Sequence, residues 1–269
     1  MEWFEAVILG LVQGLTEFLP VSSSGHLEIG KVLLGVETTD DLMFTTMVHA
    51  ATVLSTIVVF RKQIFGLLKG FFKFRYNDET DYLFKIAVSI IPVMIVGLFF
   101  KDHVEALFGS IKVVGFALLL TSALLFFSDL ASKPGKDVQK QESEARNGIS
   151  YWQAFVVGLA QALAVVPGLS RSGTTISTGL ICGVRRDVMA QFSFLMVLVP
   201  ILGESFLELV GGEFASSSVG ALPLLLGFVS AFVSGLFACK VMIALVKKAK
   251  LRWFAIYCLI AAAAIFIFA

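Results

Sequence analysis

The chain has 269 residues, of which 57% are hydrophobic and 15% are charged, and its formal net charge is +1. Soluble domains are about 45–50% apolar and about 25% charged, and one domain of this length could not bury so much apolar surface. The composition therefore excludes a disordered chain, a disulfide scaffold and a nucleic-acid-binding protein, and it predicts a polytopic membrane protein surrounded by membrane lipids.

In chain order, six segments are apolar enough to cross a membrane, which takes about 20 residues of α-helix. They are residues 44–60, 82–100, 111–130, 190–210, 219–246 and 253–269.

Two further apolar stretches, residues 5–35 and 154–184, are interrupted near their middle. Pro20 begins one interruption and Pro167 the other, and each proline is followed by a cluster of serine and glycine. Proline removes a backbone donor and clashes with the preceding turn, so each helix should stop there. Irregular backbone inside a membrane is tolerated only when it is buried in protein or lines a wet cavity. Both stretches are therefore predicted to be re-entrant helix–loop–helix hairpins.

These two interrupted stretches coincide when the chain is aligned with itself at an offset of 148 residues. The identical pairs include Gln13 with Gln161, Ser22 with Ser170, Ser24 with Ser172 and Gly25 with Gly173. We infer an internal duplication. The predicted fold is all-α, with six transmembrane spans and two re-entrant hairpins in an inverted-topology repeat. The first repeat is 1–130, a cytoplasmic linker follows at 131–150, and the second repeat is 151–269.

Charge sets the expected orientation of these repeats. Basic residues gather in alternate connections, at Arg61, Lys62, Lys69, Lys73, Arg75 and Lys85, at Lys133, Lys136, Lys140 and Arg146, at Arg185 and Arg186, and at Lys247, Lys248, Lys250 and Arg252. The loops 37–41 and 211–218 are acidic or lack basic residues. Since basic loops stay in the cytoplasm, both termini should face outward and the first hairpin should enter from outside. Inverted repeats with broken helices are typical of transporters, so the architecture alone leaves the activity open.

Ionisable side chains inside membrane segments are costly, which makes each one a functional hypothesis. Glu17, His26 and Arg171 flank the two interruptions. His49 lies in an apolar segment, where an imidazole is more often a packing residue, and we leave it outside the predicted site.

Each interruption is a serine- and glycine-rich loop that opens a helix. Such a loop presents hydroxyls and free N–H groups at the positive end of the helix dipole, which suits phosphate. The second loop adds Arg171, whose guanidinium can grip phosphate oxygens in a bidentate fork. The predicted phosphate-binding residues are Ser22, Ser24, Gly25, Ser170, Ser172, Gly173, Thr174 and Thr175. The alternative is that these hydroxyls only cap helices, which leaves Glu17, His26 and Arg171 unexplained.

The same residues suggest a reaction. Ser23, or less readily Ser22, is a candidate nucleophile, with Glu17 or His26 for general acid–base work. Glu17 can instead hold a divalent cation, with Gln13 as a neutral ligand four residues earlier on the same helix face. These roles are not separable from the residues alone.

At these positions the chain resembles the undecaprenyl-diphosphate phosphatases, an integral membrane family also known for bacitracin resistance. The resemblance is carried by the strings GLTEFLPVSSSGH at 14–26 and PGLSRSGTTIS at 167–177. The (Glu/Gln)-x-x-x-Glu element of the family corresponds to Gln13 and Glu17, and its essential residues to Ser23, His26 and Arg171.

The resemblance implies hydrolysis of undecaprenyl diphosphate to undecaprenyl phosphate and inorganic phosphate, which recycles the lipid carrier for cell-wall synthesis. It also implies dependence on Mg²⁺ or Ca²⁺ and a site opening on the outer face of the bacterial cytoplasmic membrane. His26 or a metal-bound water is the rival to Ser23 as nucleophile. A flippase or transporter of the same lipid is the alternative function, and a purely structural membrane protein is a third. The choice between a monomer and a homodimer stays open.

Overall fold

The computed structural model describes residues 1–36, 42–100, 103–104, 106–107, 110–131, 145–210, 219–248 and 250–268. The side chains of residues 42, 204–210, 247–248 and 268 are not described. The loops predicted at 37–41 and 211–218, and most of the predicted linker 131–150, lie outside these residues.

The described chain contains helices and no strand, so the all-α prediction is confirmed for these residues. The helices are α1 (Trp3–Thr16), α2 (Ser23–Leu34), α3 (Leu42–Phe71), α4 (Asp78–Phe99), α6 (Ile111–Ala131), α7 (Tyr151–Leu163), α8 (Arg171–Ile181), α9 (Arg186–Val210), α10 (Ala221–Lys248) and α11 (Arg252–Phe268), with a 3-10 turn η2 (Arg146–Gly148) before α7.

Among the described residues, five segments are long and apolar enough to cross a membrane. They are Met43–Phe71, Asp78–Phe99, Ile111–Ala131, Arg186–Gly203 and Ala221–Val246. The sixth predicted span, 253–269, corresponds to α11, which has only 17 residues. At 1.5 Å per residue such a helix is about 26 Å long, slightly less than a hydrocarbon core of about 30 Å. The apolar helices indicate an integral membrane protein with five candidate spans among the described residues, and the sixth predicted span stays a prediction.

Both interrupted stretches are helix–loop–helix units in the structure. The first turns between α1 and α2, and Ser22 caps α2 by accepting a hydrogen bond from the Gly25 amide. The second turns between α7 and α8, where Ser170 accepts from the Gly173 amide in the same way. The predicted local form is thus correct, whereas the re-entrant placement of these units in a membrane stays a prediction.

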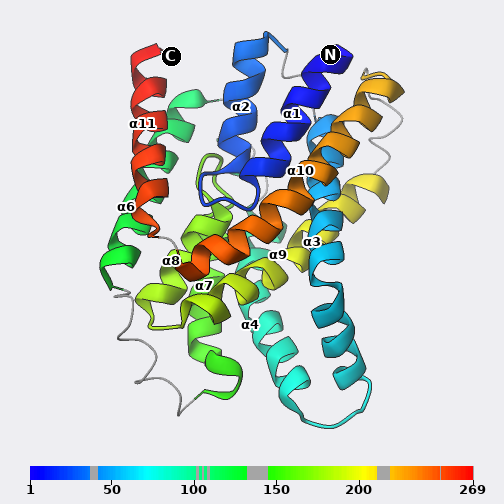
Figure 1. Ribbon diagram of the computed structural model, residues 1–269, viewed down its shortest axis with the longest axis vertical. Helices are drawn as coiled ribbons and strands as arrows, with labels where there is room; N and C mark the ends of the chain where they lie inside the picture. Colours follow the sequence, from blue (N-terminus) through cyan, green and yellow to red (C-terminus); the bar gives the residue numbers. More distant parts are fainter. Residues whose placement is uncertain are drawn as a thin grey trace.

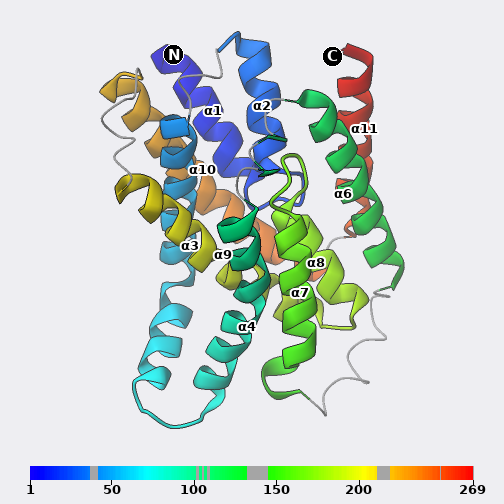
Figure 2. The ribbon, with the colours of Figure 1, turned by 180° about the vertical axis from the view of Figure 1, so that it is seen from behind.

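Figure 1 shows how the helices place the two turns. α1, α2 and the two termini lie at one end of the molecule, and the connection between α3 and α4 lies at the opposite end. α7 begins toward that opposite end, so the α7–α8 turn approaches the α1–α2 turn from the other direction, as Figure 2 shows from behind. The two turns meet between the ends of the molecule.

Helix packing joins the two halves of the chain reciprocally. α1 packs against α10, while α7 packs against α4. Both contacts need glycine, because a Cβ atom on Gly10 would collide with the Gly227 carbonyl oxygen and one on Gly158 with the Ser89 carbonyl oxygen. Small residues allow this close approach of helix backbones, which stabilises packing where lipid replaces water.

A buried polar network fastens the start of α7 to the start of α4. The Lys85 Nζ atom donates to Asp81 Oδ2 at 2.5 Å and to the Arg146 carbonyl oxygen at 2.6 Å. The Asp81 carboxylate also accepts hydrogen bonds from Tyr76, Tyr151 and Asn147. The two charged side chains are only 2–3% exposed, so each neutralises a charge that would otherwise be buried alone. This network fixes the base of the second hairpin.

Candidate active site

The Glu17 carboxylate is the centre of a polar cluster at the meeting point of the two turns. Its Oε2 atom accepts hydrogen bonds from Gln13 Nε2 at 2.8 Å and from Ser23 Oγ at 2.5 Å. Its Oε1 atom accepts one from the Arg171 guanidinium at 3.2 Å. The Glu17 side chain is only 9% exposed. The structure therefore brings together four of the predicted site residues, with a hydroxyl and a guanidinium sharing one buried carboxylate.

The local fold explains why these groups converge. Gln13 and Glu17 are four residues apart at the end of α1, so they share a helix face. The chain then reverses through Ser22, which has a positive φ of 71°, a backbone conformation that is uncommon outside glycine. This reversal returns Ser23, the first residue of α2, to the carboxylate that ended α1. Such unfavourable backbone conformations concentrate at functional sites.

The second turn supplies Arg171 and is bonded directly to the first turn. Arg171 is the first residue of α8. Beside it, Ser172 Oγ donates to the Leu19 carbonyl oxygen at 3.1 Å, and the Gly168 amide donates to Ser24 Oγ at 3.4 Å. The N-terminal ends of α2 and α8 thus meet here, and both dipoles favour an anion between the two turns.

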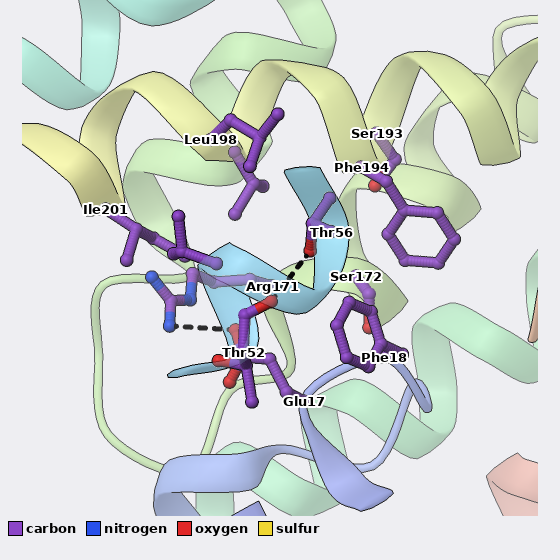
Figure 3. A pocket seen from close by; sticks show the side chains of 12 residues that line it. Glu17, Phe18, Thr52, Thr56, Arg171, Ser172, Ser193, Phe194, Leu198 and Ile201 are labelled. Carbon is purple, nitrogen blue, oxygen red and sulfur yellow. Dashed lines mark hydrogen bonds and ion pairs between the residues drawn. The ribbon is translucent and has the colours of Figure 1, made fainter. Parts of the chain in front are cut away.

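A small cavity opens beside the Glu17–Arg171 pair (Figure 3). Its volume is about 30 Å³, which is room for about one or two water molecules. Its polar lining residues are Glu17, Arg171, Ser172, Thr52, Thr56 and Ser193, and its apolar ones are Phe18, Val53, Phe194, Val197, Leu198 and Ile201. The cavity is therefore polar on the side of Glu17 and Arg171 and apolar on its other walls.

The other predicted phosphate-binding residues are mostly engaged in the two turns. The hydroxyls of Ser22 and Ser170 cap their own helices, as the alternative interpretation expects. Thr175 Oγ1 donates to the Arg171 carbonyl oxygen at 2.8 Å and lies 2.7 Å from Ser193 Oγ, whereas the buried Thr174 hydroxyl has no hydrogen-bond partner. Of the eight residues predicted to bind phosphate, Ser172 lines the cavity. The phosphate-binding role of all eight stays a prediction.

His26 lies on α2, and its two ring nitrogens contact groups other than Glu17. Its Nδ1 atom is 2.7 Å from the Ser22 carbonyl oxygen, and its Nε2 atom is 2.7 Å from the Tyr257 hydroxyl on α11. The His26 and Tyr257 rings are stacked, with centroids 5.5 Å apart. No motif in the sequence marks Tyr257, because its contact with His26 depends on how α11 packs.

His49, for which the sequence favours a packing role, lies beside Glu17 in the structure. Its Nε2 atom is 3.8 Å from Glu17 Oε2, and its Nδ1 atom is 2.9 Å from the Thr45 carbonyl oxygen. A signal was present in the sequence, because His49, Thr52 and Thr56 recur at helical spacing and so form a polar stripe on α3.

The residues around Glu17 were tested for their fit to the predicted divalent cation. Within the described residues, no three His, Cys, Asp or Glu side chains gather into a metal-binding group. Glu17 supplies one carboxylate, and the buried amide oxygen of Gln13 has no hydrogen-bond partner. Mg²⁺ often uses one or two protein oxygens together with substrate phosphates and water. The donor set fits an ion of that kind, shared with a phosphorylated substrate.

The paired hairpin turns of this helical membrane protein bring together a hydroxyl, a carboxylate and a guanidinium, a set of groups that suits phosphate chemistry. Comparison with known proteins points to the same chemistry. The family model described as Bacitracin resistance protein BacA matches residues 6–264, and the chain belongs to this family.

Several curated relatives match almost the whole chain. A protein of Bacteroides fragilis is 56% identical over 264 residues, covering 97% of this chain and 96% of the relative. A protein of Parabacteroides distasonis is 57% identical over 265 residues with the same coverage, and one of Bacteroides thetaiotaomicron is 54% identical over 271 residues, covering 99% of each chain. All three are named undecaprenyl-diphosphatase.

Proposed function

We propose that the protein hydrolyses undecaprenyl diphosphate to undecaprenyl phosphate and inorganic phosphate. The observation that carries the proposal is the Ser23 hydroxyl, which donates to a carboxylate that is also paired with Arg171. The names of its full-length relatives agree with this reaction. The polar and apolar lining of the cavity agrees with the two parts of a polyprenyl diphosphate in chemical character, although not in size.

In the proposed mechanism, Arg171 binds the oxygens of the terminal phosphate and stabilises the charge that develops during transfer. Ser23 Oγ attacks the terminal phosphorus and its proton passes to Glu17. A bond forms between Oγ and phosphorus, and the phosphoanhydride bond breaks with undecaprenyl phosphate as the leaving group. A water oxygen then attacks the phosphoserine phosphorus, the bond between Oγ and phosphorus breaks, Ser23 Oγ takes back the proton from Glu17, and inorganic phosphate leaves. Because Glu17 becomes neutral as Arg171 turns to the phosphate, the buried charges stay balanced.

Two further roles belong to this proposal. As the alternative to its role as base, an ionised Glu17 would hold Mg²⁺ or Ca²⁺ together with the Gln13 amide oxygen, and the ion would supply positive charge next to the phosphate oxygens. His26 is the rival nucleophile. The short contacts of both its ring nitrogens with other groups favour Ser23 over His26 in that role.

We also propose that the two halves are inverted repeats in a bacterial cytoplasmic membrane, with the site open to the outer side. The reciprocal packing of α1 on α10 and of α7 on α4 supports the repeat. It also favours a second candidate function, transport of the polyprenyl phosphate lipid across the bilayer. Transport predicts lipid movement in vesicles that survives replacement of Ser23, whereas hydrolysis does not survive it.

The test is phosphate release from undecaprenyl diphosphate by the detergent-purified protein, with Mg²⁺, with Ca²⁺ and with a chelator. Ser23→Ala should lose nearly all activity. The matched control is Ser122→Ala, which removes a hydroxyl that donates to the Ala255 carbonyl oxygen, away from the Glu17 cluster. Equal release by the Ser23→Ala variant and the wild type would mean that the nucleophile is His26 or water and not Ser23. A folded wild type that releases no phosphate under any of the three conditions would refute the phosphatase.

A further inference from the structure

A second and larger cavity lies between α3, α9 and α10. Its volume is about 560 Å³, within the range of about 300–1,000 Å³ that small-molecule sites occupy. Its lining residues are Val59, Phe60, Arg61, Lys62, Gln63, Asp187, Gln191 and Ile243. On α3 these residues follow those that line the Glu17 cavity, so the second cavity lies nearer the α3–α4 turn, away from the termini (Figure 1).

Aromatic side chains separate this cavity from the Glu17 site. Phe60 lines the second cavity and Phe194 lines the first, and their ring centroids are 6.1 Å apart. Phe194 in turn contacts Phe18 at 5.9 Å. All three side chains are buried. The second cavity is therefore a separate site and not an extension of the catalytic pocket.

The lining of the second cavity is cationic on one side and apolar on the other. Arg61 and Lys62 are exposed, and Arg61 Nη1 donates to the Val58 carbonyl oxygen at 2.8 Å, which leaves its other N–H groups for a ligand. Asp187 is the acidic residue of this lining, and Arg185 neutralises it through hydrogen bonds of 2.8 and 3.1 Å. Val59, Phe60 and Ile243 supply the apolar part. The lining therefore has a net positive charge on one side and apolar side chains on the other.

We propose that this cavity binds the phosphate-bearing headgroup of a lipid from the leaflet at the α3–α4 end of the molecule. Basic pockets between membrane helices select anionic headgroups, and long basic side chains reach toward the headgroup layer. A lipid uses the whole lining, because its phosphate meets Arg61 and Lys62 while its upper chain lies on Phe60 and Ile243. Free phosphate would use the cations alone and leave the apolar part without a role.

The probe is phosphatidylglycerol added to the detergent-purified full-length protein, with bound lipid counted by native mass spectrometry. Arg61→Ala/Lys62→Ala should weaken binding about tenfold, since each basic group near a membrane surface contributes measurably to the attraction. Ile243→Trp, which narrows the apolar side of the cavity and keeps its charge, should weaken it as well. The matched control is Lys69→Ala/Lys73→Ala, which removes two exposed charges near the same end but outside the cavity.

Three results would overturn the assignment. The first is wild-type lipid binding in the Arg61→Ala/Lys62→Ala variant, and the second is an equal loss in the Lys69→Ala/Lys73→Ala control, which would mean non-specific attraction. The third is displacement of the lipid by millimolar inorganic phosphate, which would make free phosphate the ligand. Arg171→Ala should retain the bound lipid even though it loses phosphatase activity, so failure here and failure of the proposed reaction are distinguishable.

Discussion

Glu17 has two tasks in the structure, and both depend on its charge. Its carboxylate aligns the Ser23 hydroxyl at 2.5 Å and balances the Arg171 guanidinium at 3.2 Å. The Arg171 side chain is only 25% exposed, so losing its counter-charge would be destabilising. The carboxylate is therefore needed before substrate arrives, and it becomes free to accept a proton when phosphate takes over the guanidinium.

Glu17→Gln tests this dual role. The amide cannot accept a proton from Ser23, so the rate of phosphate release should fall by about 10²- to 10⁴-fold, the usual contribution of a general base. The control is Glu28→Gln, which removes a carboxylate of α2 that pairs with Lys31. Turnover numbers of the two purified variants are to be compared. A Glu17→Gln enzyme within threefold of the wild type would contradict the role of Glu17 as base.

At this scale the sequence predicts contacts within one helix better than contacts between helices. The pairing of Gln13 with Glu17 follows from their spacing, and the two matched loops predicted that Arg171 lies near them. The proximity of His49 to Glu17 and of Tyr257 to His26 comes from the packing of α3 and α11 against the first hairpin. Helical periodicity identifies the face on which such a residue lies but not the helix that it meets.

At the scale of the helices, the start of α4 is bonded to the second hairpin through two acidic residues, one buried and one exposed. Asp81 is buried with Lys85, whereas Asp78, on the same helix, pairs with Arg146 at the surface. Asp81→Asn leaves the Lys85 ammonium buried without a counter-charge and should cost about 3–5 kcal/mol of stability. Asp78→Asn should change stability little, because exposed ion pairs contribute little. Thermal unfolding of the two variants in detergent measures the difference, and equal loss would contradict the network's role.

The α1–α10 contact makes a second prediction about elements. Gly10→Leu should lower stability by about 1–3 kcal/mol, the usual cost of overpacking, because its side chain would collide with α10. Gly97→Leu on α4 is the control, since nothing lies within 4 Å of a Cβ atom there. Melting temperatures of the two purified variants decide the matter. If Gly10→Leu melts like the control, the close contact of α1 with α10 is not needed.

Hydropathy identified five of the long helices because each is continuous and apolar. The span predicted at 253–269 corresponds to α11, whose 17 residues are at the short end of the usual range, so this span stays a prediction. Composition alone does not show where a C-terminal helix begins and ends. The breaks after α1 and α7 were predictable because proline has a local steric effect that does not depend on the rest of the fold.

For the whole molecule, the offset of 148 residues and the loop charges together predict an arrangement that neither predicts alone. The match of Ser22 with Ser170 indicates two similar hairpins, and the alternation of basic loops indicates that one is inverted relative to the other. In the structure the two turns approach from opposite ends and meet at Glu17 and Arg171 (Figure 2). A site assembled in this way requires both halves of the chain, so neither half should be active alone.

The orientation in the membrane is testable with single cysteines. With Cys182, Cys239 and Cys258 replaced by alanine, Glu2→Cys marks the end that holds the termini, and Lys73→Cys marks the α3–α4 end. Both positions are exposed. Because the basic loops should face the cytoplasm, a membrane-impermeant maleimide should label Glu2→Cys in intact cells and Lys73→Cys only after lysis.

Labelling in lysed cells is the control for reactivity at each position, and phosphate release by each variant shows that the fold is preserved. The opposite pattern would place the Arg61–Lys62 cavity on the outer side and the N-terminal hairpin on the inner side. That result would require the diphosphate to be hydrolysed from the cytoplasmic face. Labelling of both cysteines in intact cells would mean that α3 does not cross the membrane, which would contradict the proposed topology.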